Sequence, residues 1–211
     1  MKTHDLITLL AQDNRRPVNL SIAISVAIVA GTAIAALIFF SMLGLRHDLA
    51  LALKTVRFDF KFLVTLTLFA TATSLVAATI RPGSKLVIRR RLLLSAPILL
   101  AAAVTVEMAV TPPDQWLGKL IGRNALHCLT IIPALSLFPA FCLFLAIRNG
   151  APENPGVAGA IAALVSAGIA STLYASNCFD DSPLFVATWY PIAAGIVATA
   201  GYFAGKRFLR W

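Results

Sequence analysis

Charged residues are scarce in this chain of 211 residues: Asp, Glu, Lys and Arg make up 13% of it, whereas hydrophobic residues make up 59%. A soluble domain carries about 25% charged residues. A secretory signal is also lacking, because the first 17 residues are polar and charged and the apolar run that follows is much longer than a signal-peptide core. We therefore expect an integral membrane protein whose first spanning helix stays attached.

The motifs of common enzyme classes are missing as well. The chain has no Cys-x-x-Cys, no phosphate-binding loop, no nucleophile elbow and no paired acids in mid-membrane. A quinone-linked thiol oxidase would need a Cys-x-x-Cys or four cysteines, and the chain has 3. A transporter would show broken spans with polar residues at the midplane. We expect no enzymatic activity; a membrane thiol redox enzyme, a small-solute transporter and a scaffold without a sensing role are the alternatives.

Six apolar stretches are each long enough to cross a bilayer, which takes about 20 residues. The fifth is rich in Gly and Ala, which suits close packing of helices in lipid. The predicted fold class is therefore all-α, a polytopic membrane protein with six transmembrane helices in residues 18–211. The spans cover about residues 18–44, 62–80, 92–110, 128–147, 156–175 and 184–203.

Residues 1–17 predict a short amphipathic helix that ends at the break Asn14 to Pro17. Thr3 is a candidate N-cap, and Asp5 in the first turn favours the helix dipole. An apolar stripe follows at helical spacing. Its members are Leu6, Ile7, Leu9 and Leu10. On these residues alone, the segment is either a loose tail or a helix that lies on the bilayer surface.

The basic residues fix the orientation. With the N-terminus in the cytoplasm, twelve of the 18 Lys and Arg residues lie inside and six outside. Basic residues concentrate in cytoplasmic loops, so both termini are expected inside. The inner set is Lys2, Arg15, Arg16, Arg81, Lys85, Arg89, Arg90, Arg91, Arg148, Lys206, Arg207 and Arg210, and the outer set is Arg46, Lys54, Arg57, Lys61, Lys119 and Arg123.

Two of the three cysteines fall at the outer face in this topology. Cys128 starts the fourth span and Cys178 follows the fifth, whereas Cys142 lies roughly 20 Å deeper in the fourth span at 1.5 Å per residue. Cys128 and Cys178 could form a disulfide, remain a thiol pair or bind a soft metal transiently as thiolates. The neighbouring His127 could add a nitrogen ligand or lower a thiol pKa.

Asp180 and Asp181 follow Cys178 in the stretch Asn-Cys-Phe-Asp-Asp-Ser-Pro. They could supply oxygen ligands beside the thiols. The same stretch is also typical of a helix start, with Ser182 or Asp181 as N-cap and Pro183 in the first turn. Both roles stay open.

Other polar and aromatic residues fall at the ends of spans. Glu107 is the only acid in the third span, and its place near the outer end indicates an interfacial residue rather than a proton relay. Trp116, Trp189 and Tyr190 are expected in the aromatic belt at the membrane surface.

Four stretches together resemble one known family. They are the start Met-Lys-Thr-His-Asp-Leu-Ile-Thr-Leu-Leu-Ala-Gln-Asp, the Arg-x-Gly-Ala-Pro turn at residues 148–152, the stretch from Asn177 to Tyr190, and the closing Arg-Phe-Leu-Arg-Trp. The chain resembles the NrsF-like proteins, proteobacterial inner-membrane negative regulators of sigma F with six spans. The resemblance covers essentially the whole chain. One departure is His4-Asp5, where the family commonly has Asp-Asp.

The resemblance implies an anti-sigma factor of the bacterial inner membrane. Its partners would be an extracytoplasmic-function sigma factor on the cytoplasmic side and the lipid bilayer, without direct contact to nucleic acid. Periplasmic Cys128 and Cys178 would sense stress, with His127, Asp180 and Asp181 as auxiliary residues, and no cofactor is expected beyond the transient soft metal. An amphipathic helix laid in a groove is a common recognition mode. The sigma-binding residues would be Asp5, Leu6, Leu9, Leu10 and Asp13.

Overall fold

The computed structural model describes residues 19–79, 86–150 and 152–209, and all regular secondary structure in these ranges is helical. Six stretches of it are long and apolar enough to cross a membrane, which confirms the all-α fold with six span-length helices. The helices are α2 (Leu20–Met42), α3 (Leu49–Ala52), α4 (Val56–Thr79), α5 (Leu86–Leu93), α6 (Ser95–Val110), α7 (Pro113–Ile121), α8 (Ala125–Ile147), α9 (Pro155–Ala175) and α10 (Pro183–Phe208). The predicted helix in residues 1–17 lies outside the described residues.

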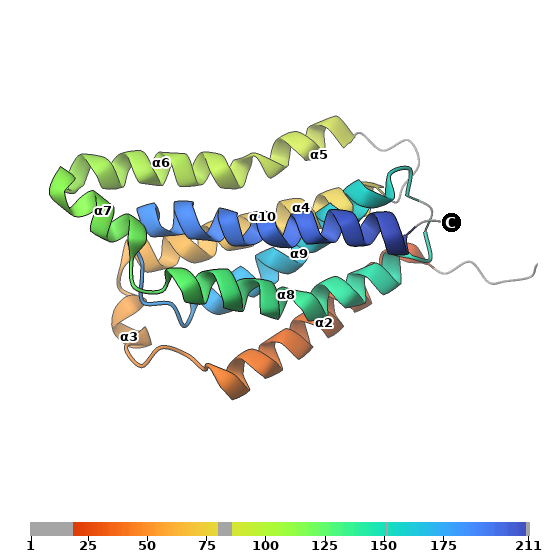
Figure 1. Cartoon of the computed structure of the whole chain (residues 1–211), viewed down its shortest axis with the longest axis horizontal. Helices are drawn as coiled ribbons and strands as arrows, with labels where there is room; N and C mark the ends of the chain where they lie inside the picture. Colours follow the sequence, from red (N-terminus) through yellow and green to blue (C-terminus); the bar gives the residue numbers. More distant parts are fainter. Residues whose placement is uncertain (1–18, 80–85, 151, 210–211) are drawn as a thin grey trace, which may run out of the picture.

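Helix α9 is the centre of the bundle and packs against α10, α4 and α8. Helices α6 and α2 lie on opposite sides of it (Figure 1). In the most apolar 18-residue stretch of α9, 72% of the residues are buried. The corresponding share is 17% in the candidate span that contains α6. The Gly- and Ala-rich composition of α9 therefore suits the helix with the most neighbours, as the sequence indicates.

Glycine lets α9 and α10 approach at backbone distance. A Cβ added to Gly159 would lie 2.3 Å from the carbonyl oxygen of Gly201, and one added to Gly201 would lie 2.3 Å from the Cβ of Ala163. Any larger residue at either position would have to push the two backbones apart. This contact lies where α9 begins and α10 approaches its end.

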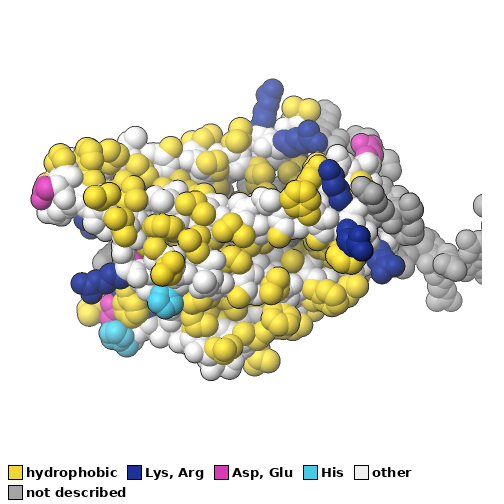
Figure 2. Space-filling model, in the orientation of Figure 1, with side chains coloured by type: hydrophobic (Ala, Val, Ile, Leu, Met, Phe, Trp, Pro, Cys, Tyr) yellow, Lys and Arg dark blue, Asp and Glu magenta, His cyan; other side chains and the backbone are white. Residues whose placement is uncertain are grey.

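Hydrophobic side chains cover the sides of the bundle, and charged side chains gather at its two ends (Figure 2). Exposed apolar residues on these sides include Val29, Leu37, Ile98, Phe141 and Phe203. Such a belt is far larger than the apolar patches of soluble monomers, so it is suited to lipid contact. We name the end that holds α3, α7 and the loop 176–182 the thiol end; the other end holds the start of α2 and the end of α10.

Three boundaries differ from the sequence prediction. Helix α4 begins at Val56 rather than at residue 62, because Arg57 and Lys61 in its first turns have partners and need no interfacial loop. The polar connection 111–127 contains α7, with Pro113 in its first turn. The third span is interrupted at Leu94, since Pro97 has no N–H to donate to the carbonyl of Leu93.

Candidate thiol site

The two cysteines predicted to face each other are brought together at the thiol end. Cys128, in the first turn of α8, is 0% exposed, and Cys178, in the loop after α9, is 1% exposed. Both residues belong to one hydrophobic cluster, and the Cys178 thiol donates to the carbonyl oxygen of Asp180 at 3.9 Å. Cys142 packs against a different cluster and is half-buried. All three are free thiols.

Two tyrosines complete the cluster around the thiols. Tyr174, in the last turn of α9, is 1% exposed and belongs to the same cluster as both cysteines. The ring of Tyr190, from α10, lies 6.2 Å from the ring of Tyr174. Tyr190 is 5% exposed, so the prediction that it belongs to the aromatic belt is wrong. We call Cys128, Cys178, Tyr174 and Tyr190 the thiol cluster.

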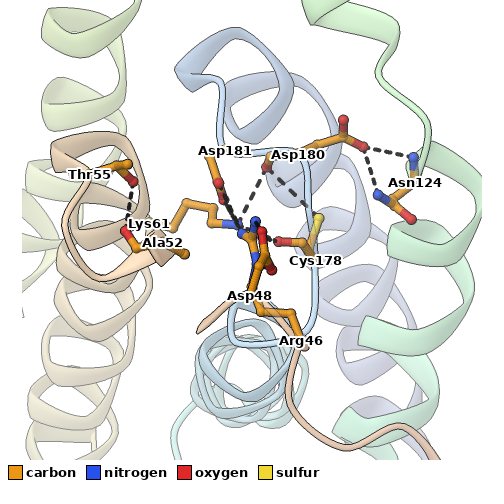
Figure 3. A network of polar contacts seen from close by, with 9 residues as sticks. All are labelled: Arg46, Asp48, Ala52, Thr55, Lys61, Asn124, Cys178, Asp180 and Asp181. Carbon is orange, nitrogen blue, oxygen red and sulfur yellow. Dashed lines mark hydrogen bonds and ion pairs between the residues drawn. The ribbon is translucent and has the colours of Figure 1, made fainter. Parts of the chain in front are cut away.

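A clamp of four charged residues holds the loop that carries Cys178 (Figure 3). Lys61 is 0% exposed; its Nζ donates to the carbonyl oxygen of Cys178 at 2.9 Å and forms an ion pair with Asp181. Arg46 is 8% exposed and donates to the same carbonyl at 3.3 Å and to Asp181 at 2.9 Å. Its other nitrogens bind Asp48 at 2.6 and 2.7 Å. We call Arg46, Asp48, Lys61 and Asp181 the clamp.

The clamp joins three parts of the chain that are far apart in sequence: the α2–α3 connection, the second turn of α4, and the loop 176–182. A buried charge is tolerated only when it is paired and hydrogen-bonded. Here each cation meets a carboxylate as well as a backbone carbonyl. The backbone of Cys178 is therefore fixed by two cations from two other elements.

Asp180 fixes the same loop to the helix that carries the other cysteine. Its Oδ2 accepts hydrogen bonds from the backbone N–H groups of Arg123 and Asn124, at 2.9 and 2.8 Å, and from the side-chain amide of Asn124 at 2.9 Å. It therefore fixes the turn that leads into α8. Gly122, with a φ of 61°, closes the turn before it.

The helix-start role predicted for the stretch after Cys178 is confirmed in part. Ser182 is the N-cap of α10 and accepts from the N–H of Leu184 at 3.3 Å, with Pro183 in the first turn. Asp181 is not the cap, because its carboxylate pairs with Arg46 and Lys61. His127 is exposed on α8, whereas the adjacent thiol of Cys128 is buried.

The contacts around the loop shift the pKa values of three side chains away from their ordinary values. The hydrogen bond from Arg46 lowers the pKa of Asp48, and the same bond raises the pKa of Arg46 above its usual range. The pKa of Cys178 is lowered, first by the hydrogen bond from the Cys128 thiol and then by the charge of Lys61. Cys178 is therefore the more readily activated thiol of the pair.

A second group of paired charges holds the edge of the bundle at the same end. Glu107, predicted to be interfacial, lies in the last turn of α6 and is 4% exposed. It forms ion pairs at 2.9 Å with Arg57 of α4 and Lys119 of α7. Thr111 also contacts its carboxylate. The group ties α4, α6 and α7 together.

Lys61 and Arg46 are the site residues that sequence reasoning missed. The sequence alone indicates only that both belong to the outer set of basic residues. A signal was present: Lys61 precedes a long apolar run and Arg46 lies in a largely apolar connection, where a cation needs a partner. The sequence does not identify the partner that the two cations share, because Asp181 is distant from both in the sequence.

Within the described ranges, no group of three or more His, Cys, Asp and Glu residues is arranged to hold a metal ion. The carboxylates of Asp180 and Asp181 are occupied by the contacts above. The thiol cluster offers two sulfur atoms to a soft metal, with phenol groups around them.

Comparisons with known proteins cover the whole length of the chain. The family model described as "Negative regulator of sigma F" matches residues 10–211. The chain belongs to this family. The resemblance noted on the sequence is thereby confirmed.

Two relatives of this negative regulator of sigma F family are similar over their full length. The anti-sigma-F factor NrsF of Caulobacter vibrioides is 34% identical over 217 residues, and a probable anti-sigma-F factor NrsF of Azospira oryzae is 31% identical over 215 residues. Each alignment covers 100% of both chains. No solved structure matches the chain.

Proposed function

We propose that the chain is a membrane-bound anti-sigma factor that sequesters an extracytoplasmic-function sigma factor and releases it when its thiol pair reacts. One observation carries the proposal: in a member of the sigma F regulator family, a cysteine of α8 and a cysteine of the loop after α9 lie together at one end of a six-helix bundle. Family membership favours this role over a thiol redox enzyme or a small-solute transporter.

The protein would lie in the bacterial inner membrane, with both termini in the cytoplasm and the thiol end in the periplasm. The apolar sides of the bundle support the membrane location. The excess of basic residues on the side of the termini supports the orientation. An oxidising periplasm is a compartment in which a thiol pair can respond to oxidants.

The sigma factor would dock on residues 1–17. The apolar stripe Leu6, Leu9 and Leu10, flanked by Asp5 and Asp13, is suited to a groove on the partner. Deletion of residues 1–13 is expected to abolish co-purification of the sigma factor while the protein still inserts into membranes. Full retention of the sigma factor by the inserted truncation would assign the docking surface elsewhere.

The arrangement of helices supports a route from the thiols to this segment. Cys128 is carried by α8, which packs along α2 and α9. A Cβ added to Gly31 of α2 would lie 2.6 Å from the Cα of Pro139 in α8, so the two backbones are in direct contact there. Helix α2 follows residues 1–17 directly. A shift of α8 against α9 would therefore reach the docking segment through α2.

The sensor role is tested in cells that carry the sigma factor and a reporter gene. The Cys128→Ser, Cys178→Ser double variant is expected to keep the sigma factor sequestered under hydroperoxide and under Cd²⁺, because no thiol pair is left to oxidise or to bind a soft metal. Cys142→Ser is the matched control and should respond like the wild type. A normal response of the double variant to both agents would remove the thiol pair from the mechanism.

A further inference from the structure

The hydroxyl of Tyr190 is buried without a hydrogen-bond partner among the residues that the structure describes. A phenol that is 5% exposed normally finds a partner. An unmade bond at a buried donor is a cost to stability that selection has no structural reason to keep. The same deficit occurs at the hydroxyl of Thr73 on α4.

Tyr190 lies in the same part of the core as the two thiols. Tyr190 packs in one cluster with Cys128, Cys178 and Tyr174. Its ring lies 6.2 Å from the ring of Tyr174, which belongs to the same cluster. A thiol is a weak acceptor, so the reduced pair gives a phenol little to bind.

Oxidation would supply the missing acceptor. When the sulfur of Cys178 attacks a hydroperoxide, an S–O bond forms and the O–O bond breaks. The sulfur loses two electrons to the peroxide, and the thiol proton leaves with the alkoxide as an alcohol. The product is a sulfenic acid, whose oxygen is a new hydrogen-bond acceptor. The thiol of Cys128 can then displace this oxygen as water and form a disulfide.

We propose that Tyr190 is a positioning residue of the thiol pair, whose hydroxyl donates a hydrogen bond to the oxygen that a hydroperoxide transfers to Cys178. Tyr190 stabilises the oxygen as the S–O bond forms. Cys178 is the attacking thiol, because the ammonium group of Lys61, bound to the carbonyl oxygen of Cys178, favours its thiolate. Burial of the pair favours a small uncharged oxidant such as hydrogen peroxide.

The inference rests on the proposed function only for the choice of oxidant, and its test needs no sigma factor. The full chain with Cys142→Ser is purified in detergent, and loss of the two thiols is followed with hydrogen peroxide and, separately, with 4,4′-dithiodipyridine. The rate with 4,4′-dithiodipyridine depends on the accessibility and the reactivity of the thiols, but this reaction transfers no oxygen. Tyr190→Phe is expected to slow the peroxide reaction about fivefold, the effect of one ordinary hydrogen bond. It should leave the dithiodipyridine rate unchanged.

Thr73→Val is the matched control, because it removes the other unpaired hydroxyl from a different helix; both rates should stay at the parent values. In the reduced protein, neither Tyr190→Phe nor Thr73→Val should lower the melting temperature. The proposal would be overturned if Tyr190→Phe slowed the reactions with both probes equally, or if it left the peroxide rate unchanged. A lower melting temperature of reduced Tyr190→Phe would also overturn it, since the hydroxyl would then have a partner at rest. Failure of the cysteine variants in cells would instead count against the sensor role.

Discussion

The two ends of the α9–α10 pair are held together in opposite ways. At the thiol end, the two helices separate around the loop 176–182, and Arg46 and Lys61 reach in from other elements to hold it. At the other end, Gly159 and Gly201 bring the two backbones into direct contact. The first end depends on charge and the second on the absence of side chains. A loop held by charge can respond to chemistry at Cys178, whereas a glycine contact has no group that reacts.

The largest effect is expected from breaking the charge contact. Lys61→Ala removes a buried cation from Asp181 and from the carbonyl oxygen of Cys178, and removal of one partner of a buried pair costs about 3 kcal/mol. Equilibrium unfolding in detergent measures the loss.

Lys54→Ala at the same end is the control, because Lys54 is exposed, and its effect should stay within about 0.5 kcal/mol. Equal losses in the two variants would mean that the clamp does not hold this end.

The glycine contact should give an intermediate effect. Gly159→Ala places a methyl group against the backbone of Gly201, so α9 and α10 must separate, and overpacking of this kind costs about 2 kcal/mol. Gly195→Ala, on α10 with open space around it, is the matched control. It should stabilise the protein by up to about 1 kcal/mol through the higher helix propensity of Ala. The same sign for both variants in thermal unfolding would contradict the close contact.

The smallest effect is a dependence on acid that only the charged end should show. Arg46 holds the pKa of Asp48 below its ordinary value of 3.8. The stability that the ionised carboxylate contributes is therefore complete above that value and is lost as the pH falls through the lower, folded-state pKa. Melting temperatures should be higher for the wild type than for Asp48→Asn at about pH 7, and the difference should shrink as the pH falls below 3.8.

Asp59→Asn is the control, because Asp59 is exposed on α4. A difference between wild type and Asp48→Asn that stays constant down to about pH 3 would show that the carboxylate charge does not contribute.

The spans could be predicted from the sequence because a bilayer imposes a length and an apolar composition on each helix. Ser182 and Pro183 could be identified as a helix start because the cap and the first turn are adjacent in the sequence. The sequence predicts too late a start for α4, because charged residues next to an apolar run are typical of the membrane interface. Arg57 and Lys61 instead lie inside the helix, because Glu107 and Asp181 pair with them.

The sequence by itself determined the all-helical class, the six span-length segments, the family and the two cysteines worth attention, since composition, periodicity and motifs are local. Only the tertiary structure decided what surrounds the thiols. It buries Lys61 beside Cys178, directs Asp180 to the start of α8 rather than to a metal, and moves Tyr190 from the surface to the thiol cluster. These contacts join residues that are distant in the chain, and a distant partner changes the role of a side chain without changing the sequence around it.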